Sequence, residues 1–425
     1  MSESTEPAQE PSSEPDSIGI AEAREPIGRR EFVAKAGRAL GLSALPLASC
    51  SGARSRLPTS HQDRSADALI ADLEKRIPPL MRDGNVPGVS VAIIRNAKLF
   101  WRRGFGVKDI ATNEPVDNDT VFEAASTSKP VFAYAVMKLC ERGVMDLDTP
   151  LTKYTSGRYL EGDPRLDLIT ARHVLSHTSG FQNFRTLAEP LRIHFTPGEK
   201  WLYSGEAYSY LQSVVTELAG GRVNPSDCGR FEAGLEVCAI EPSIDVYMKT
   251  NLLLPFGMTS SGYFWNDWIE RHMARGYLPD GKRSEANRKP SGPSVARYGM
   301  VGGLCTTPTD YARFLIELID PKPSDRFRLN ERSRAEMLRP QIRSSPWSHW
   351  ALGWEVEHTE TGDVIKHGGG NPGYACIVVA SIEQKTGYVI MTNAEDIGYF
   401  NVIAKLIGTD PLASLLGNRL HTKNG

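Results

Sequence analysis

Residues 121–143 read VFEAASTSKPVFAYAVMKLCERG, and this stretch determines how the rest of the chain is interpreted. Its pattern predicts an apolar helix over 127–142 that ends at Gly143, because glycine readily adopts the left-handed conformation found after many helices. Ser126 and Lys129 stand three residues apart at the start of this helix, so their side chains share one face. The positive end of the helix dipole also favours an oxyanion that develops beside Ser126.

This spacing predicts a serine nucleophile with a lysine as its base. A serine hydroxyl attacks poorly until a base accepts its proton, and a lysine can do so only when it is neutral. Lowering the lysine pKa by about three units corresponds to about 4 kcal/mol, a shift that burial and a second cationic group can supply. A Ser-x-x-Lys pair also arises by chance, and the alternative is a helix-capping Ser126 with an exposed Lys129.

Two longer stretches resemble one known group of serine enzymes. They are VFEAASTSKPVFAYAVMKLCERGVMDLDTPLTKY at 121–154 and HVLSHTSGF at 173–181. Together with Gly104-Phe105-Gly106, they are similar to segments of the serine β-lactamase-related family, which includes class C β-lactamases, DD-peptidases and family VIII-type esterases. The resemblance covers about residues 67–416 and implies a hydrolase that forms an acyl-enzyme at Ser126 and needs no metal or organic cofactor.

The second family motif, Tyr-x-Asn, has a counterpart in TPGEKWLYSGEAYSYLQSVV, where it reads Tyr203-Ser204-Gly205. The resemblance implies that Tyr203 exchanges protons with the nucleophile and the leaving group; the alternative is a tyrosine that only packs against the next helix. Gly205 replaces the asparagine that holds the acyl side chain of a lactam or peptide in the family. The loss of one donor and one acceptor, worth about 1–3 kcal/mol when the partner stays buried, argues against efficient β-lactam turnover.

The third family motif, Lys-Thr-Gly, is present literally as Lys385-Thr386-Gly387. It lies between two β-rich runs, 374–382 and 388–393, so it is predicted to occupy a hairpin turn rather than the active site. The tripeptide His367-Gly368-Gly369 fits the family spacing instead and is expected to begin the strand beside the site.

The resemblance assigns roles to this second tripeptide and to the glycine that follows it. Gly368 and Gly369 would let a substrate backbone approach the strand closely, and the N–H of Gly370 would join that of Ser126 as an oxyanion donor. His367, with an ordinary pKa near 6.5, replaces a charged lysine and favours neutral esters or amides over penicillins. A purely structural histidine is the alternative.

Strand patterns occur at both ends of the chain, with mainly helical patterns between them. The expected fold is α/β of the α+β type: an antiparallel sheet built from N- and C-terminal strands, flanked by helices, with an inserted helical lobe, as in β-lactamases and penicillin-binding proteins. The predicted divisions are a disordered tail with an export signal at 1–50, a linker at 51–64, a hydrolase domain at 65–416 (α/β lobe 65–125 and 296–416, helical lobe 126–295) and a tail at 417–425.

The N-terminus predicts export. Arg29-Arg30 precede an apolar run at 39–48, which resembles a twin-arginine signal and is far too short to span a bilayer. Residues 47–50, LASC, resemble a lipoprotein signal that ends in a lipidated Cys50. The sequence therefore predicts a periplasmic or cell-envelope lipoprotein that contacts the membrane only through Cys50; the alternative is a cytoplasmic tail in which both patterns arise by chance.

Composition excludes few other functions. Charged residues make up 24% of the chain and the net charge is -2, so no nucleic-acid partner is expected. CxxC and HExxH are absent, which argues against zinc, and no serine has the GxSxG surroundings of other esterases. The expected partner is a small ester, amide or peptide substrate. A non-hydrolytic penicillin sensor or an inert homologue stays the alternative function. Cys228 and Cys238, in segment 221–246, are expected to form either a disulfide or two free thiols.

Overall fold

The computed structural model describes residues 61–186, 188–220, 223–230, 236–240, 243–263, 265–284, 295–296, 299–395, 398–407 and 410–416. The predicted export signal, Cys50 and the tail at 417–425 lie outside the described residues. The first helix begins at His61, within the predicted linker.

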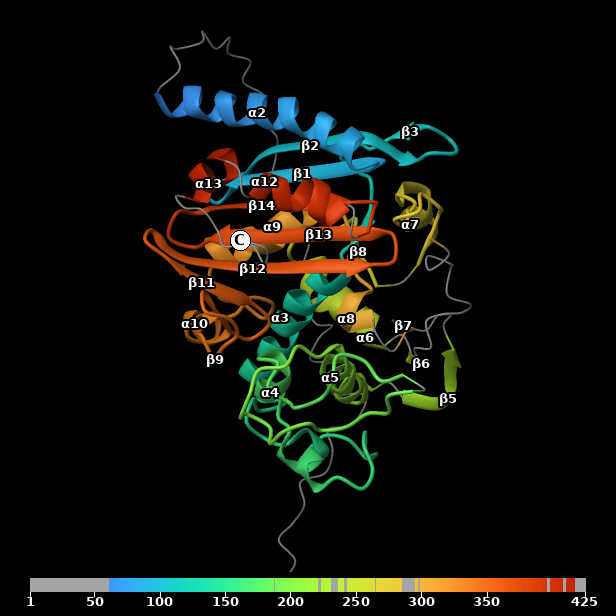
Figure 1. Cartoon of the computed structure of the whole chain (residues 1–425). Helices are drawn as coiled ribbons and strands as arrows, with labels where there is room; N and C mark the ends of the chain where they lie inside the picture. The colour runs from blue at the N-terminus through green and yellow to red at the C-terminus, as the bar shows by residue number, and fades with distance from the viewer. Residues whose placement is uncertain are drawn as a thin grey trace, which may run out of the picture. The chain divides into compact units, whose positions relative to one another are not determined.

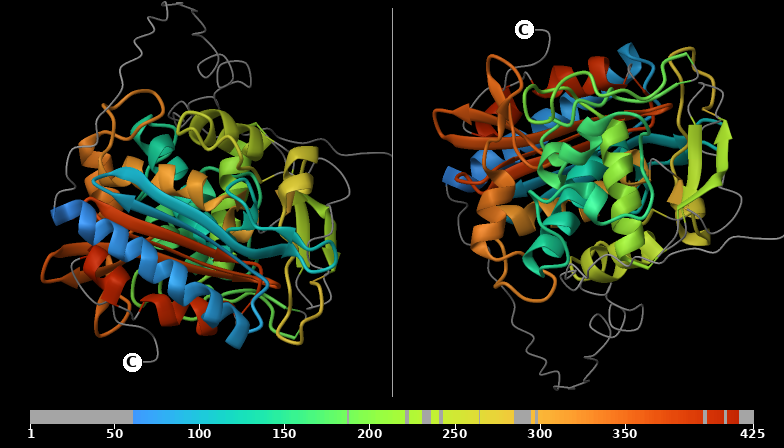
Figure 2. Two further views of the ribbon diagram at one scale, coloured as in Figure 1. Left: turned by 90° about the horizontal axis from the view of Figure 1, so that it is seen from above. Right: turned by 90° about the horizontal axis from the view of Figure 1, so that it is seen from below.

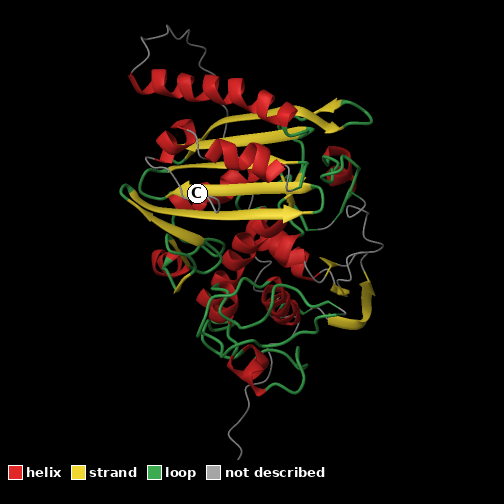
Figure 3. Cartoon of the chain, viewed as in Figure 1, coloured by secondary structure: helices red, strands yellow, loops and turns green. Residues whose placement is uncertain are grey.

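Secondary structure follows the order expected of a mixed α/β chain (Figure 3). The strands are β1 Gly88–Arg95, β2 Lys98–Asp109, β3 Glu114–Pro115, β4 Phe122–Glu123, β5 Val223–Arg230, β6 Glu236–Ile240, β7 Val295–Ala296, β8 Cys305–Thr306, β9 Ile342–Arg343, β10 Ser348–Trp350, β11 Glu355–Thr359, β12 Gly362–Asn371, β13 Tyr374–Ser381 and β14 Thr386–Thr392. The α-helices are α2 His61–Asp83, α3 Ser128–Glu141, α4 Ala171–Leu175, α5 Gly205–Leu218, α6 Ser243–Met248, α7 Asp267–His272, α8 Gly299–Gly302, α9 Pro308–Ile319, α10 Glu331–Leu338, α12 Ala404–Ile407 and α13 Asp410–Leu416. Short 3-10 and π-helical turns are η1 Ala125–Thr127, η2 Leu151–Lys153, η3 Pro164–Leu168, η4 Lys249–Leu253 and η5 Tyr399–Ile403.

The main sheet combines the two ends of the chain, as predicted (Figure 1). Its strand order is β3-β2-β1-β14-β13-β12-β11-β10-β9, and the paired strands are antiparallel. The central contact joins β1 to β14, with Val89 opposite Thr392 and Ile94 opposite Gly387. The β1–β2 hairpin turns at Asn96 and Ala97, whose φ values of 52° and 54° suit a tight type I′ turn.

One face of the sheet is covered by α2 and the C-terminal helices, which lie on the same side (Figure 2). Leu73 and Ile77 of α2 pack with Leu406 of α12 and with the alternate apolar residues of β1, β13 and β14. Pro78 and Pro79 lie inside α2 without ending it. The single helix predicted near 400–416 is instead divided into η5, α12 and α13.

The opposite face is covered by α9, which contacts β1, β2 and β14. The turn η1 contacts β12. Beyond α9, the helix α3 contacts α8 and α10, and α5 contacts α4 and α8. Farther along the chain, β5 and β6 form a ladder in which Cys228 stands directly opposite Cys238. No helix in the described part of the chain is both long and apolar enough to cross a membrane.

Candidate active site

The candidate nucleophile lies on η1, the short turn that leads into α3. Ala125 has a φ of 46°, in the left-handed region that non-glycine residues rarely adopt. The hydroxyl groups of Thr127 and Ser128 donate to the carbonyl oxygens of Ala124 and Ala125, each at 2.7 Å. These bonds hold Ser126, which is half-buried, at a fixed place before the helix.

Lys129 lies fully buried beside Ser126. Its Nζ donates to Ser126 Oγ at 2.9 Å and to the carbonyl oxygen of Val301 at 2.9 Å. Burial lowers the pKa of Lys129 to about 7, because the charged amine loses its hydration. The exposed lysine considered as an alternative is therefore wrong. Burial lowers the pKa by itself, without the second cationic group that was expected to contribute.

Tyr203 is the third side chain at this site, beside Ser126 and Lys129. Its phenol is hydrogen-bonded to the Ser126 hydroxyl, and its ring lies 5.0 Å from Lys129 Nζ. Burial raises the pKa of Tyr203 above its ordinary value, and the bond to Ser126 only partly opposes this. Tyr203 is therefore a neutral phenol at neutral pH, while the Lys129 amine is poised between its charged and neutral forms.

A cluster of rings supports Tyr203. The His177 ring lies 4.2 Å from that of Tyr203 and 4.8 Å from that of Trp350, and His367 lies 5.5 Å from Trp350. His177 Nδ1 accepts a hydrogen bond from the backbone N–H of Ser204 at 3.1 Å, so the ring proton is on Nε2. Burial lowers the pKa of His177 well below its ordinary value, so the histidine packs as a neutral ring.

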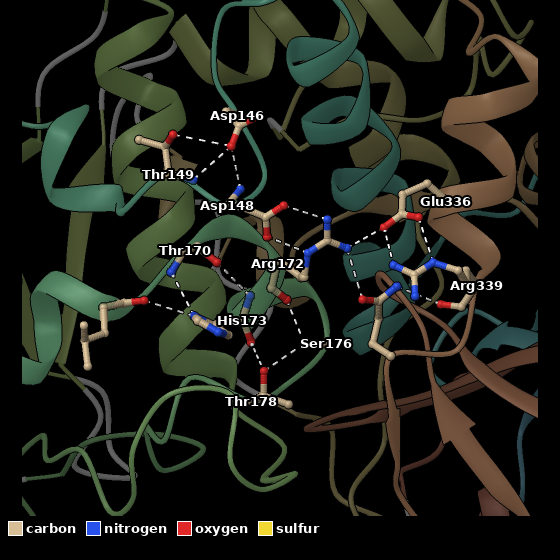
Figure 4. Close-up of polar contacts among 12 residues, drawn as sticks. Asp146, Asp148, Thr149, Thr170, Arg172, His173, Ser176, Thr178, Glu336 and Arg339 are labelled. Atoms are coloured by element: carbon tan, nitrogen blue, oxygen red, sulfur yellow. Dashed lines mark hydrogen bonds and ion pairs between the residues drawn. The ribbon is translucent and has the colours of Figure 1, made fainter.

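The loop that carries His177 is fixed by the ion-pair network of Figure 4. Arg172 on α4 forms two hydrogen bonds with the Asp148 carboxylate, at 2.6 and 2.9 Å, and also pairs with Glu336 of α10. Ser176 Oγ donates to the carbonyl oxygen of Arg172 at 2.7 Å and lies 2.9 Å from Thr178 Oγ1. These contacts hold the residues on both sides of His177, which itself has a φ of 56°.

The tripeptide His367-Gly368-Gly369 lies in the second half of β12, and the expectation that it begins the strand is wrong. Pairing with β11 ends at Lys366, while pairing with β13 continues to Asn371. Among the described residues, β11 therefore covers only the first half of this edge of β12, up to Lys366.

Close approach to the candidate nucleophile, Ser126, requires glycine at one of these positions. A Cβ on Gly369 would come within 2.9 Å of the Ser126 backbone nitrogen and 2.8 Å of the Ala124 oxygen. A Cβ on Gly370 would meet nothing within 4 Å, and one on Gly368 would meet nothing nearer than 3.8 Å. The structure therefore brings Gly369 into contact with the nucleophile turn.

The arrangement of Ser126, Lys129 and Tyr203 agrees with the family to which the sequence matches. Residues 73–407 match the family model described as Beta-lactamase. The chain belongs to the β-lactamase family. Members of this family are usually serine hydrolases.

Curated members of the β-lactamase family that resemble the chain are distant. Protein flp of Staphylococcus aureus is 20% identical over 353 residues, which cover 79% of this chain. Penicillin-binding protein 4* of Bacillus subtilis is 24% identical over 340 residues, covering 72% of this chain and 68% of that protein. The chain spans 64% of the length of protein flp.

Solved structures of two such proteins share the fold. The octameric penicillin-binding protein homologue from Pyrococcus abyssi superposes with a TM-score of 0.62 and 22% identity, covering 81% of this chain and 79% of that one. D-alanine carboxypeptidase AmpC from Burkholderia cenocepacia gives a TM-score of 0.64 and 20% identity, covering 80% of this chain and 99% of that one. Both have the β-lactamase and penicillin-binding protein fold.

The literal Lys-Thr-Gly of this family member lies away from the site. Lys385 occupies the turn between β13 and β14 with a φ of 51°, and its exposed amine pairs with Asp320 at 2.8 Å. The end of β13 nearest the site pairs Ala375 with Gly370, whereas Ser381 pairs with Thr386 at the other end. Six residues of strand put about 20 Å between these two ends of β13. The predicted turn position is confirmed for Lys385, whereas Thr386 and Gly387, which were expected in the same turn, are the first residues of β14.

The Tyr-x-Asn position of the family has no room for a side chain here. A Cβ on Gly205 would lie 2.5 Å from Cε1 of Phe184 and 3.1 Å from Cγ1 of Val301. The Phe184 ring thus fills the space that a residue larger than glycine would need.

Sequence reasoning did not identify His177, Trp350 or Val301 as part of the site. His177 lies within HVLSHTSGF, which carried the family resemblance, so a signal for it was present. Val301 contributes its backbone carbonyl, and no side-chain pattern marks such a contact. In the described part of the chain, no group of three or more His, Cys, Asp or Glu residues could hold a metal ion.

Proposed function

We propose that the chain is a serine hydrolase that cleaves an ester or amide bond through an acyl-enzyme on Ser126. The proposal rests chiefly on one observation: Lys129 Nζ lies 2.9 Å from Ser126 Oγ in a buried place that lowers its pKa to about 7. A lysine in that state can accept a proton at neutral pH, which an ordinary surface lysine cannot.

In the first half of the reaction, Ser126 Oγ attacks the substrate carbonyl carbon and its proton moves to the neutral Lys129 amine, directly or through the Tyr203 phenol. The bond to the leaving group then breaks, and the leaving oxygen or nitrogen takes that proton. The backbone N–H groups of Ser126 and Gly370 would hold the oxyanion, which lowers the barrier by electrostatic stabilisation.

In the second half, a water molecule attacks the acyl-enzyme ester. Its proton returns to the same pair, Lys129 and Tyr203, and Ser126 Oγ is released as a hydroxyl. The raised pKa of Tyr203 supports a relay through a neutral phenol, with Lys129 as the group that stores the proton. His367 borders the site through its ring contacts with Tyr203 and Trp350.

The preferred substrates under this proposal are neutral esters or amides. Gly205 supplies no side-chain amide, and His367 stands where a charged lysine would attract a carboxylate. β-Lactam hydrolysis or D-amino-acid peptidase activity is the second candidate, because the relatives include a penicillin-binding protein and a D-alanine carboxypeptidase. A sensor that stays acylated is the third.

One experiment separates the three. The protein is incubated with a short-chain aryl ester and with a fluorescent penicillin, and Ser126→Ala serves as the control. Rapid ester turnover with slow penicillin labelling supports the ester or amide hydrolase. Fast penicillin hydrolysis supports the β-lactamase, and persistent labelling without turnover supports the sensor.

We also propose that the protein is exported through a twin-arginine-like signal and anchored by a lipid on Cys50, as the N-terminal sequence suggests. Metabolic labelling with a fatty-acid analogue, followed by cell fractionation, tests this. Cys50→Ser should abolish the label and release the protein from the membrane fraction. A label that persists in this variant would contradict the proposal.

A further inference from the structure

A pair of polar side chains joins the end of β12 to the segment that leads into the nucleophile turn, η1. Asn371 is the last residue of β12, and Glu123 is the last residue of β4, shortly before η1 begins at Ala125. Asn371 Nδ2 donates to Glu123 Oε2 at 2.6 Å, although 248 positions separate the two residues in the chain. The reaction described above uses neither side chain.

Asn371 also reaches the backbone turn that holds Lys129. The same Nδ2 group donates to the carbonyl oxygen of Gly302 at 3.0 Å. The preceding carbonyl, that of Val301, accepts the hydrogen bond from Lys129 Nζ. A Cβ on Gly302 would lie 3.3 Å from Asn371 Oδ1 and 3.6 Å from the carbonyl carbon of Ala125. One amide group therefore ties together three segments of the site: β12, the approach to η1, and α8.

Short stretches of backbone separate this pair from the reacting groups. Glu123 precedes Ser126 by three residues. Asn371 directly follows Gly370, the proposed oxyanion donor. At Gly369, β12 is packed so closely on η1 that an added Cβ would come within 2.9 Å of the Ser126 backbone nitrogen. A shift at the end of β12 would therefore change the distance between the oxyanion donors and the serine hydroxyl.

The carboxyl group of Glu123 is kept at a cost to the folded state. Burial raises its pKa to about 7, because the carboxylate loses hydration, and the bond from Asn371 only partly opposes this. Its partner across β8 is Cys305, and Tyr374 lies close enough to interact electrostatically. Since the folded pKa exceeds the ordinary value of 4.5, Glu123 lowers the free energy of unfolding progressively as pH rises from about 4.5 to about 7. A role in stability alone does not explain such a residue.

From these contacts we infer that Glu123 and Asn371 are positioning residues, which hold the end of β12 against η1 and α8 so that the oxyanion donors face the Ser126 hydroxyl. Both the carboxylate and the protonated acid offer an oxygen that accepts from Asn371, so the pair persists in either charge state. Alignment of this kind acts on the transition state more than on substrate binding. This inference rests on the acyl-enzyme reaction proposed above.

The test measures acylation by para-nitrophenyl acetate in a stopped-flow experiment, which gives the maximal acylation rate and the ester concentration at half-saturation. Glu123→Ala removes the acceptor, and Asn371→Ala removes the donor. Glu123→Gln keeps an oxygen that accepts from Asn371 and removes the charge. Tyr374→Phe is the matched control, because it removes a different buried hydrogen bond near the same end of the hairpin, from the Tyr374 hydroxyl to the Ala274 carbonyl oxygen at 2.6 Å.

We expect the maximal acylation rate to fall about 10-fold in Glu123→Ala and in Asn371→Ala, with half-saturation unchanged, and to stay within about 2-fold of wild type in Glu123→Gln. The double variant Glu123→Ala/Asn371→Ala should be no slower than Asn371→Ala, because two groups that act as a pair are not additive. Tyr374→Phe should lower the melting temperature and keep the wild-type rate.

Wild-type acylation in a folded Glu123→Ala or Asn371→Ala protein would overturn the inference. An equal loss of rate in Glu123→Gln would also overturn it, by assigning the effect to charge. An equal loss in Tyr374→Phe would do the same, by assigning the effect to stability. If Glu123→Ala does not fold, Asn371→Ala and Glu123→Gln decide the question. Acylation that survives Ser126→Ala would overturn the proposed reaction instead, so the two failures are distinguishable.

Discussion

Lys129 should set the pH at which Ser126 becomes reactive. Burial holds the pKa of this amine at about 7, and only the neutral amine can accept the serine proton. The rate of acylation should therefore rise about 10-fold per pH unit below pH 7 and level off above it, with a single ionisation. Lys129→Arg, whose guanidinium stays protonated, should not acylate at any pH in this range.

The lowered pKa of Lys129 also decreases the free energy of unfolding, and the size of this decrease depends on pH. The amine has an ordinary value of 10.5 and a folded value of about 7, so the unfolded chain binds the proton more tightly than the folded one. The free energy of unfolding must then rise as pH increases from about 7 to about 10.5, and the penalty is complete below pH 7. At pH 7 this penalty is about 4 kcal/mol, from 1.36 kcal/mol per pKa unit.

Lys129→Met removes the charge and preserves most of the volume. It also leaves the Val301 carbonyl without its donor, which costs about 1–3 kcal/mol. The net expectation is a variant that is about 1–3 kcal/mol more stable than wild type at pH 7 and less stable near pH 10.

Two measurements check this reasoning. Stopped-flow acylation with an aryl ester gives the pH profile, and urea unfolding of both proteins at about pH 6, 7 and 9 gives the stability difference. A rate with no inflection near pH 7 would refute the role of Lys129 as the base. A stability difference that does not change with pH would refute the buried, shifted amine itself.

Four further substitutions test the structure away from the reacting atoms. Lys385→Ala should leave ester turnover unchanged and the free energy of unfolding within about 0.5 kcal/mol, as measured by kinetics and urea titration, because its ion pair is exposed. Gly353→Ala should lower the free energy of unfolding by about 3 kcal/mol in the same titration, because φ is 89° and the new Cβ would lie 2.7 Å from Ala133 Cβ. Gly143→Ala, where φ is also positive but the new Cβ would meet nothing within 4 Å, should lower the free energy of unfolding by only about 1 kcal/mol. Arg172→Ala should destabilise by about 2 kcal/mol at low ionic strength, a difference that should shrink when unfolding is repeated in high salt; a loss that is independent of salt would point to packing rather than charge.

The sheet was predictable because its signals are local. The apolar runs that form β1, β2, β13 and β14 predict strands by their length and by their alternation of apolar and polar residues. Asn96-Ala97 suits the turn between β1 and β2. The pairing of Ser126 with Lys129 was equally local, since three residues separate them on one helical face. In each case the information lies within a single window of sequence.

The remaining parts of the site depend on contacts between distant segments. Val301 reaches Lys129 through a backbone carbonyl, which any residue could offer. The space at Gly205 is closed by the ring of Phe184, which lies 21 residues earlier in the chain. Single-sequence patterns carry no record of such contacts. The position of His367 was misjudged by half a strand for a related reason: the turn before β12 falls at Thr361, which gives that strand an earlier start than its glycines suggest.

The pairing of β1 with β14 also has a consequence for synthesis. About 290 residues of chain separate the two strands, and at roughly 5–20 residues per second the ribosome needs about 15–60 s to make them. Throughout that time the apolar edge of β1 in the β1–β2 hairpin has no partner strand, because β14 has not yet been synthesised. The nascent protein should therefore depend on chaperones until β14 leaves the ribosome. A stop codon placed just before β14 should therefore leave aggregated chains rather than a shorter, folded product.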